Sequence, residues 1–237
     1  MKKLISLLLS MAMVFSMTAV QALAADEETA MLADTGAEGT DAPVAQTVTL
    51  DLSQGSITIS ATGYKQGSGD ETPFTGAYTI KQDDKAYLNN TVSVTGGTHE
   101  ITMNDVVIDV SNSSGACAFS IATGATVDLK LAGRVMLKSG EYAAGLSVPT
   151  GAAVTISAVS ASGALTAEGG KYGAGIGSYN KEYGNFSAAS GGNITILSGT
   201  VGALGGERAA GIGGGYSGNG TGTGETICIS GGRVMAT

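Results

Sequence analysis

Two insertions flanked by glycine carry the side chains best suited to bind a ligand. They span residues 177–192 and 214–224 and interrupt otherwise regular strand-forming sequence. Aromatic rings can stack on the faces of sugars, while amides and hydroxyls supply directional hydrogen bonds. Insertions of this kind often lie on the binding face of a repeat protein. The expected binding residues are Tyr179, Asn180, Tyr183, Asn185, Phe186, Tyr216 and Asn219. The alternative is that both loops are solvated and fold their rings back onto neighbouring strands.

The ionisable side chains give little support for catalysis. Solenoid lyases and glycosidases gather carboxylates with Arg or Lys on one face. Only Arg134 and Arg233 share a repeat position here, and the single histidine, His99, is expected in a surface turn. The acids of the repeat region stand at different offsets, namely Asp128, Glu141, Glu168, Glu207 and Glu225. We therefore expect no enzyme and no catalytic residue.

The cysteine and histidine pattern predicts neither a metal site nor a cofactor. No spacing typical of zinc ligands occurs, and the Gly-Gly-x-Gly-x-Asp calcium repeat is absent from the sequence. Export would permit a disulfide between Cys117 and Cys228. These residues fall in distant repeats that should not touch, so we expect both to act as small, free, partly buried side chains.

An internal repeat is the strongest signal in the chain. Three stretches end alike, as YAAGL at 142–146, YGAGI at 172–176 and RAAGI at 208–212. A strand-turn-strand pattern precedes each of them and occurs once more near the end of the sequence. The paired segments are 127–129 with 133–137, 154–156 with 163–167, 194–196 with 199–203, and 227–229 with 232–236.

The repeat unit indicates a stack of short strands. Apolar and polar residues alternate within each segment, which is typical of strands with one buried face. Such strands are too short to be stable alone, and glycines at their ends allow sharp bends, often with positive φ. Stacked units would align Val, Ile, Leu and Ala in columns. The expected fold is all-β, a right-handed parallel β-helix, with an antiparallel sandwich or a β-prism as the alternative.

The chain divides into four regions. Residues 1–24 resemble a secretory signal, with Lys2 and Lys3 before an apolar run and a cleavage pattern ending at Ala24. An uncleaved membrane anchor is the alternative. Residues 25–47 are acidic and without aromatics, which predicts a disordered linker. Residues 48–110 should form a cap with irregular first coils, and residues 111–237 the Gly-rich repeats. The last unit stops before its glycine pair, so we expect a truncated C-terminal end.

Composition limits the partners. The chain carries 12 Lys and Arg against 20 Asp and Glu, and residues 1–24 contribute two lysines and no acid. An acidic exported protein is a poor ligand for nucleic acid or anionic membrane. We expect no membrane contact in the mature form, a monomer, and an extracellular location, either secreted or on the cell surface.

The repeats resemble those of large surface proteins of anaerobic, clostridia-like bacteria. The resemblance covers roughly residues 75–237 and rests on TVDLKLAG at 126–133, AGLSV at 144–148, GALTAEGG at 163–170 and GAGIG at 173–177. Such proteins are described as carbohydrate-binding-domain-containing and pectate-lyase-like. The resemblance implies a right-handed β-helix and a plant polysaccharide ligand, and it is the sole ground for considering calcium.

Three hypotheses about function follow. The first is a binding module that recognises polysaccharide or host glycan in adhesion. The second is a structural stalk that holds a distal domain away from the cell. The third, with the least support, is a fragment of a polysaccharide lyase.

Overall fold

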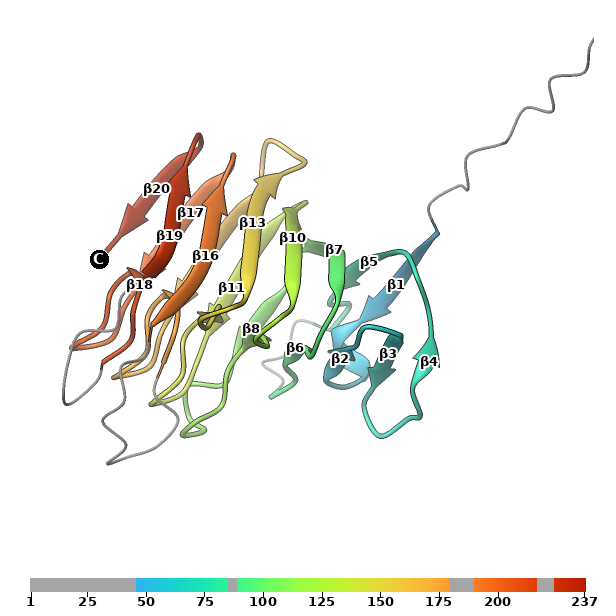
Figure 1. Ribbon diagram of the computed structural model, residues 1–237. Coiled ribbons are helices and arrows are strands. Elements are labelled where there is room, and N and C mark those ends of the chain that lie inside the picture. Colours follow the sequence, from blue (N-terminus) through green and yellow to red (C-terminus); the bar gives the residue numbers. More distant parts are fainter. Residues whose placement is uncertain (1–45, 85–88, 180–189, 217–223) are drawn as a thin grey trace, which may run out of the picture. The chain divides into compact units, whose positions relative to one another are not determined.

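The structure is a computed structural model that describes residues 46–84, 89–179, 190–216 and 224–237 (Figure 1). Contacts divide the chain into two units, Met1–Ala42 and Pro43–Thr237, and every described residue belongs to the second. The expected signal segment, most of the expected linker, and five expected binding residues lie outside the described residues. These five are Asn180, Tyr183, Asn185, Phe186 and Asn219. No helix among the described residues is long and apolar enough to cross a membrane.

Three sheets hold the described strands. Sheet A contains β1 (Thr47–Asp51), β5 (Ala77–Lys81), β7 (Thr98–Asn104), β10 (Thr126–Leu131), β13 (Ala153–Ala158), β16 (Gly191–Ile196) and β19 (Gly224–Ile229). Sheet B contains β2 (Ile57–Ile59), β6 (Val92–Val94), β9 (Phe119–Ile121), β12 (Leu146–Ser147), β15 (Ile176–Gly177) and β18 (Ile212–Gly213). Sheet C contains β8 (Val107–Asp109), β11 (Arg134–Lys138), β14 (Ala164–Glu168), β17 (Thr200–Leu204) and β20 (Arg233–Ala236).

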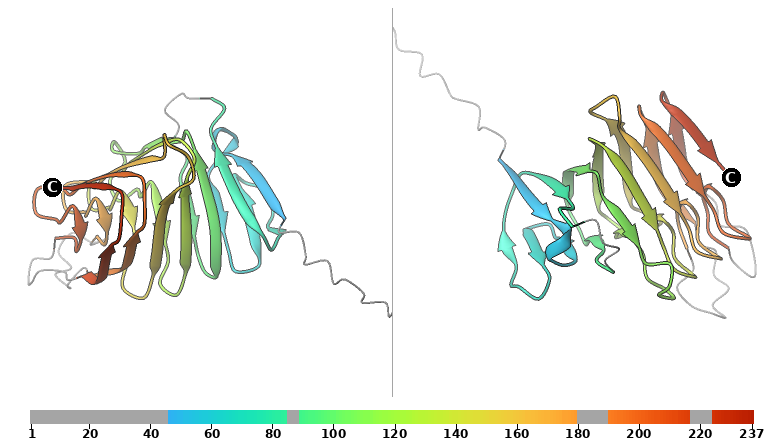
Figure 2. Two further views of the ribbon diagram at one scale, coloured as in Figure 1. Left: turned by 90° about the horizontal axis from the view of Figure 1, so that it is seen from above. Right: turned by 180° about the vertical axis from the view of Figure 1, so that it is seen from behind.

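From β7 onward the chain visits sheet A, then sheet C, then sheet B, and returns to sheet A beside its previous strand. All strand pairs formed in this way are parallel, as the side-by-side arrows of β10, β13 and β16 show in Figures 1 and 2. The expected all-β class and parallel pairing are confirmed. The helical content of the described residues is the single 3₁₀ turn η1 (Leu52–Gln54).

The strand register aligns apolar side chains in columns. Val127 stands beside Val154, which stands beside Ile194, and all three side chains are at most 2 % exposed. On sheet C, Val135 pairs with Leu165 in the same way. Residues between these positions point outward, because successive side chains of a strand alternate in direction. The inward residues form one continuous core.

Glycines at the ends of the paired segments are expected to allow bends with positive φ. Gly199 and Gly232 have a positive φ, whereas Gly133 and Gly163 do not. The glycines shared by the repeat ends, Gly145, Gly175 and Gly211, have none either. A Cβ placed on Gly175 would instead lie 2.5 Å from the Leu204 nitrogen and 2.7 Å from the Gly211 oxygen. These glycines are therefore needed because successive backbones approach too closely for a side chain. Positive φ occurs at Gly124 and Gly151, in the turns after β9 and β12.

The N-terminal region contains two strands that the sequence pattern did not predict. Strands β3 (Gly63–Gln66) and β4 (Thr72–Pro73) add to sheet B in antiparallel pairing beside β2. Rings of Tyr64, Phe74 and Tyr78 meet edge to face at 5.2–6.2 Å between centroids. This aromatic packing departs from the aliphatic columns of the later repeats.

His99 is a correction to the expected surface turn. It lies within β7, is 9 % exposed, and packs against Tyr78 with ring centroids 5.7 Å apart. Its Nε2 atom lies 2.7 Å from the Gly96 oxygen. The alternation of β7 turns His99 inward, in register with Val127, so it is a core residue rather than a solvated one.

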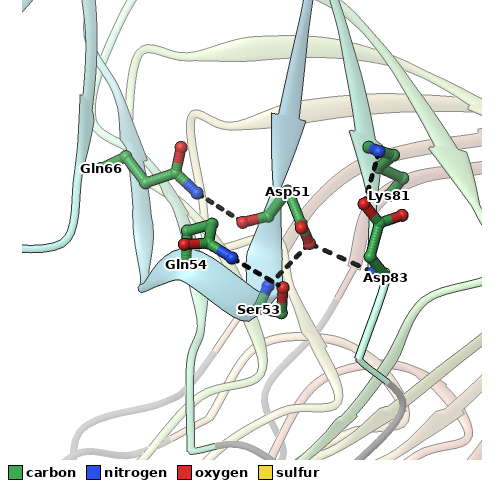
Figure 3. Close-up of polar contacts among 6 residues, drawn as sticks. All are labelled: Asp51, Ser53, Gln54, Gln66, Lys81 and Asp83. Carbon is green, nitrogen blue, oxygen red and sulfur yellow. Dashed lines mark hydrogen bonds and ion pairs between the residues drawn. The ribbon is translucent and has the colours of Figure 1, made fainter.

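A small polar cluster ties the first strands together (Figure 3). The Asp51 carboxylate accepts hydrogen bonds from the backbone nitrogens of Ser53 and Asp83, at 3.0 and 3.2 Å. The Gln66 side chain donates to the Asp51 backbone oxygen, and Lys81 pairs with Asp83 at 2.6 Å. Burial alone would raise the pKa of Asp51, but the donors from Ser53 and Asp83, with Lys81 nearby, lower it overall. The cluster is structural, because its donors and acceptors serve one another.

Candidate functional site

A hollow of 440 Å³ opens on the outer face of sheet B. Its floor comes from β6, β9 and β12, and its rim from the turn after β9 and from the segment that follows β15. A volume of this size is within the range of small-molecule sites. Its lining residues are Ser93, Cys117, Ser120, Ile121, Ala122, Thr123, Ser147, Pro149 and Tyr179.

A row of serines crosses the floor, and we call Ser93, Ser120 and Ser147 the hydroxyl row. Each occupies the outward position of its strand, and the parallel register places Ser120 beside both of the others. The Ser120 hydroxyl donates to the Ser93 hydroxyl at 3.1 Å. A hydroxyl has one donor and two acceptor sites, so such a row keeps capacity for further hydrogen bonds. The row therefore offers an uncharged polar strip on which a hydroxyl-rich ligand could lie.

Tyr179 forms the aromatic part of the hollow. It comes directly after β15 and is half-buried, while Ser147 beneath it is 2 % exposed. Burial, with a smaller effect of the neighbouring Cys117, raises the pKa of Tyr179 to about 12, and a side-chain hydrogen bond with Ser147 offsets this only in part. The phenol is therefore neutral at physiological pH. Sequence reasoning had singled out Tyr179, and the structure places it in a lined hollow.

Cys117 lies at the same hollow and is partly exposed. Its Sγ atom lies 3.3 Å from the backbone oxygen of Phe119 and 3.2 Å from that of Ala144, and its one proton can be donated to either. Cys228 is exposed on sheet A, and neither cysteine forms a disulfide. The sequence placed both at positions for small residues, and the structure adds that only Cys117 lines the hollow.

Tyr216, the other described residue of the expected binding set, is placed elsewhere. Its ring lies 5.3 Å from that of Tyr172, which stacks in turn on Tyr142 at 5.0 Å. The Arg208 guanidinium lies 5.3 Å from the Tyr216 centroid and donates to its hydroxyl at 3.3 Å. This tyrosine row packs along neighbouring repeats, so much of the Tyr216 ring surface is covered by protein. The structure does not bring Tyr216 together with Tyr179 at the hollow.

One group of acids is less scattered than the sequence suggested. Glu141 and Glu207 occupy the same repeat position, and Lys171 occupies it in the repeat between them. The Lys171 ammonium is 3.9 Å from the Glu207 carboxylate. The hydroxyl of Tyr172, together with Glu207, Tyr172 and Glu141 as nearby charges, raises the pKa of Lys171. The expectation of different offsets was thus wrong for these two glutamates.

The metal-ligating side chains of the described residues are dispersed. No three His, Cys, Asp or Glu side chains in this part of the chain stand close enough to hold an ion. Arg134 and Arg233 share a column of sheet C as expected, but β14 and β17 separate them.

The hydroxyl row is what sequence reasoning missed. The pattern of Ser between two apolar residues recurs at Ser93, Ser120 and Ser147, and it had served only to align repeats. The recurring serine at the outward position could have revealed the row, but the alternation that predicts a strand does not depend on which residue points outward.

No family model matches the chain, and no curated protein and no solved structure matches it.

Proposed function

We propose that this chain is a glycan-binding module of a secreted or cell-surface protein, built on a right-handed parallel β-helix and acting in adhesion. The observation that carries the proposal is the hollow on sheet B, where a neutral tyrosine stands over a row of serine hydroxyls. Sugars present both hydroxyls and apolar ring faces, and this lining offers partners for each.

The β-helix is part of the proposal, supported by the cyclic order of the three sheets and the parallel register. A right hand is expected because parallel strands joined by a crossover are right-handed in nearly every known case. Export is supported by the sequence of residues 1–24 alone.

A stalk is the second candidate, and one observation favours it. Parallel pairing continues without interruption from β7 to β19 in sheet A, and ion pairs join neighbouring repeats on the outside. Such a stack would hold a distal domain at a distance without binding anything itself. A lyase finds less support, because the two arginines that share a repeat position, Arg134 and Arg233, are separated on sheet C by β14 and β17.

Binding of the exported protein to a glycan array, followed by calorimetry, tests the proposal. The Tyr179→Leu and Ser120→Ala variants should weaken binding, the latter by about three- to tenfold because one hydrogen bond is lost. Thr155→Ala is the matched control, since Thr155 is also an outward, partly buried hydroxyl but lies on sheet A. Failure of the wild-type protein to bind any glycan would favour the stalk.

Cys117 allows the ligand to be located. In a Cys228→Ser background, a small thiol reagent reports on Cys117 alone among the described residues. A bound glycan should slow the modification of Cys117, because this thiol lines the hollow. Binding without such protection would place the ligand elsewhere on the protein.

A further inference from the structure

Four neighbouring strands of sheet B, β6, β9, β12 and β15, differ from the rest of the protein in their charge. The strands β6, β9, β12 and β15 with their adjoining turns cover residues 91–97, 116–125, 143–152 and 173–179. These four ranges contain no Asp, Glu, Lys, Arg or His. The whole chain carries 20 Asp and Glu and 12 Lys and Arg, so these ranges differ from the chain as a whole.

The other two sheets carry charged residues at their outward positions. On sheet A, Lys130 pairs with Glu100 at 2.6 Å between Nζ and Oε2. On sheet C, Lys138 pairs with Glu168 at 3.0 Å. Charged residues can therefore occupy outward positions in this fold, and within sheet B the strands β6, β9, β12 and β15 carry none, whereas β3 contains Lys65.

The lining of the hollow is also uncharged. Of its nine lining residues, only the thiol of Cys117 and the phenol of Tyr179 can ionise. The pKa of Tyr179 is raised to about 12 by burial, which keeps that group neutral. Among the described residues, a ligand in the hollow would therefore meet hydroxyls, a ring and short apolar side chains, and no charged group.

We propose that the hollow selects uncharged saccharides and discriminates against uronic and sialic acids. This inference rests on the proposed glycan-binding function and names its ligand class. Transfer of a carboxylate from water to a site without a cation costs free energy that hydroxyl donors only partly return. The negative charge of the whole protein adds a long-range repulsion toward polyanions.

The experiment compares two oligosaccharides of equal length, one of neutral hexoses and one of hexuronic acids, by calorimetry on the exported protein. We expect the neutral ligand to bind at least about tenfold more tightly, which corresponds to about 1.4 kcal/mol. Raising NaCl from about 0.05 to about 0.5 M should change the affinity for the neutral oligosaccharide by less than about twofold, because this ligand forms no ion pair with the protein.

A charge inserted into the hydroxyl row gives the matched variant. Ser120→Lys should improve binding of the uronic acid oligomer and make that binding salt-sensitive. Thr155→Lys, which adds the same charge to sheet A, should leave the ratio of the two affinities nearly unchanged. Ser93→Lys repeats the test if Ser120→Lys does not fold.

The outcomes separate the two proposals. Tighter binding of the uronic acid oligomer by the wild-type protein would overturn the selectivity while leaving glycan binding intact. Equal affinities for the neutral and the uronic acid oligomer would also overturn the selectivity and leave glycan binding intact. Binding of neither oligomer, nor of any other glycan, would overturn the proposed function itself.

Discussion

Sheet B and sheets A and C come from the same repeats, yet their outer faces differ. The outward residues of β10 and β11 include charged side chains paired with neighbouring strands, whereas β6, β9 and β12 present serines. Inward positions on all three sheets are mainly aliphatic. The comparison shows that the core restricts only one side of each strand, so the other side can be specialised by sheet.

The two kinds of face also differ in how closely backbones approach one another. Strands of sheet B are only two or three residues long from β9 onward, and glycines such as Gly175 pack against the backbone of the next repeat. On sheet C, a Cβ at Gly202 would meet nothing nearer than 3.9 Å. Glycine is therefore a packing requirement in the segments leading to sheet B and not on the face of sheet C.

The largest expected effect on the free energy of unfolding comes from replacing glycine with alanine at two positions, one in each environment. Gly175→Ala should lower the free energy of unfolding by about 1–3 kcal/mol, because its Cβ would overlap a fixed backbone. Gly202→Ala should raise it by about 0.4–1 kcal/mol, because alanine restricts the unfolded chain and finds space in the folded one. Urea unfolding followed by circular dichroism measures both. Equal effects of the two substitutions would contradict the contrast between the sheets.

A second prediction concerns the half-buried phenol of Tyr179 at the hollow. Since the folded-state pKa of Tyr179 is raised from 10.0 to about 12, its contribution to stability is complete below pH 10 and is lost as the pH rises toward 12. The wild-type protein should lose about 1–2 kcal/mol more than Tyr179→Phe over this range.

Denaturant unfolding at neutral pH and near pH 11 measures this difference. Both proteins should also share a decline, because burial raises the pKa of Tyr78 as well. Parallel pH profiles for wild type and variant would show that Tyr179 is solvated rather than packed over the hydroxyl row.

Hydroxyl groups on the two sides of the sheets give a third prediction. The outward Ser93 and Ser120 bond to each other, whereas the inward hydroxyl of Tyr78 on β5 has no hydrogen-bond partner among the described residues. Tyr78→Phe should leave the free energy of unfolding unchanged or raise it by about 1 kcal/mol, because an unsatisfied polar group leaves the core. Tyr64→Phe in the same aromatic cluster is the control. A clear loss of stability in Tyr78→Phe would reveal a partner for the hydroxyl.

The smallest effect is expected from the ion pairs on the charged faces. A double-mutant cycle on Lys130 and Glu100 should give a coupling energy below about 1 kcal/mol, because these side chains are partly solvated. Added salt should reduce it further. A coupling of several kcal/mol would mean that the charged faces contribute to stability as strongly as the core does.

The candidate site was only partly predictable from sequence. The aromatic content of the insertion at 177–192 indicated Tyr179, because an exposed aromatic in a loop rarely serves the core. The same reasoning selected Tyr216, which the structure stacks with Tyr172 and Arg208. The local sequence around Tyr179 and Tyr216 does not distinguish their surroundings, because each ring contacts residues of a neighbouring repeat.

In the repeats from residue 111 onward, the sequence by itself determined the strand positions and which side of each strand is buried, because alternation with period two is a local property. It could not determine which outward residues become neighbours, since the separation between contacting residues varies. Ser93 and Ser120 are 27 residues apart, whereas Thr150 and Ser190 are 40 apart. Only the tertiary structure decided that register, and with it brought three serines, a thiol and a tyrosine to one hollow on an uncharged face.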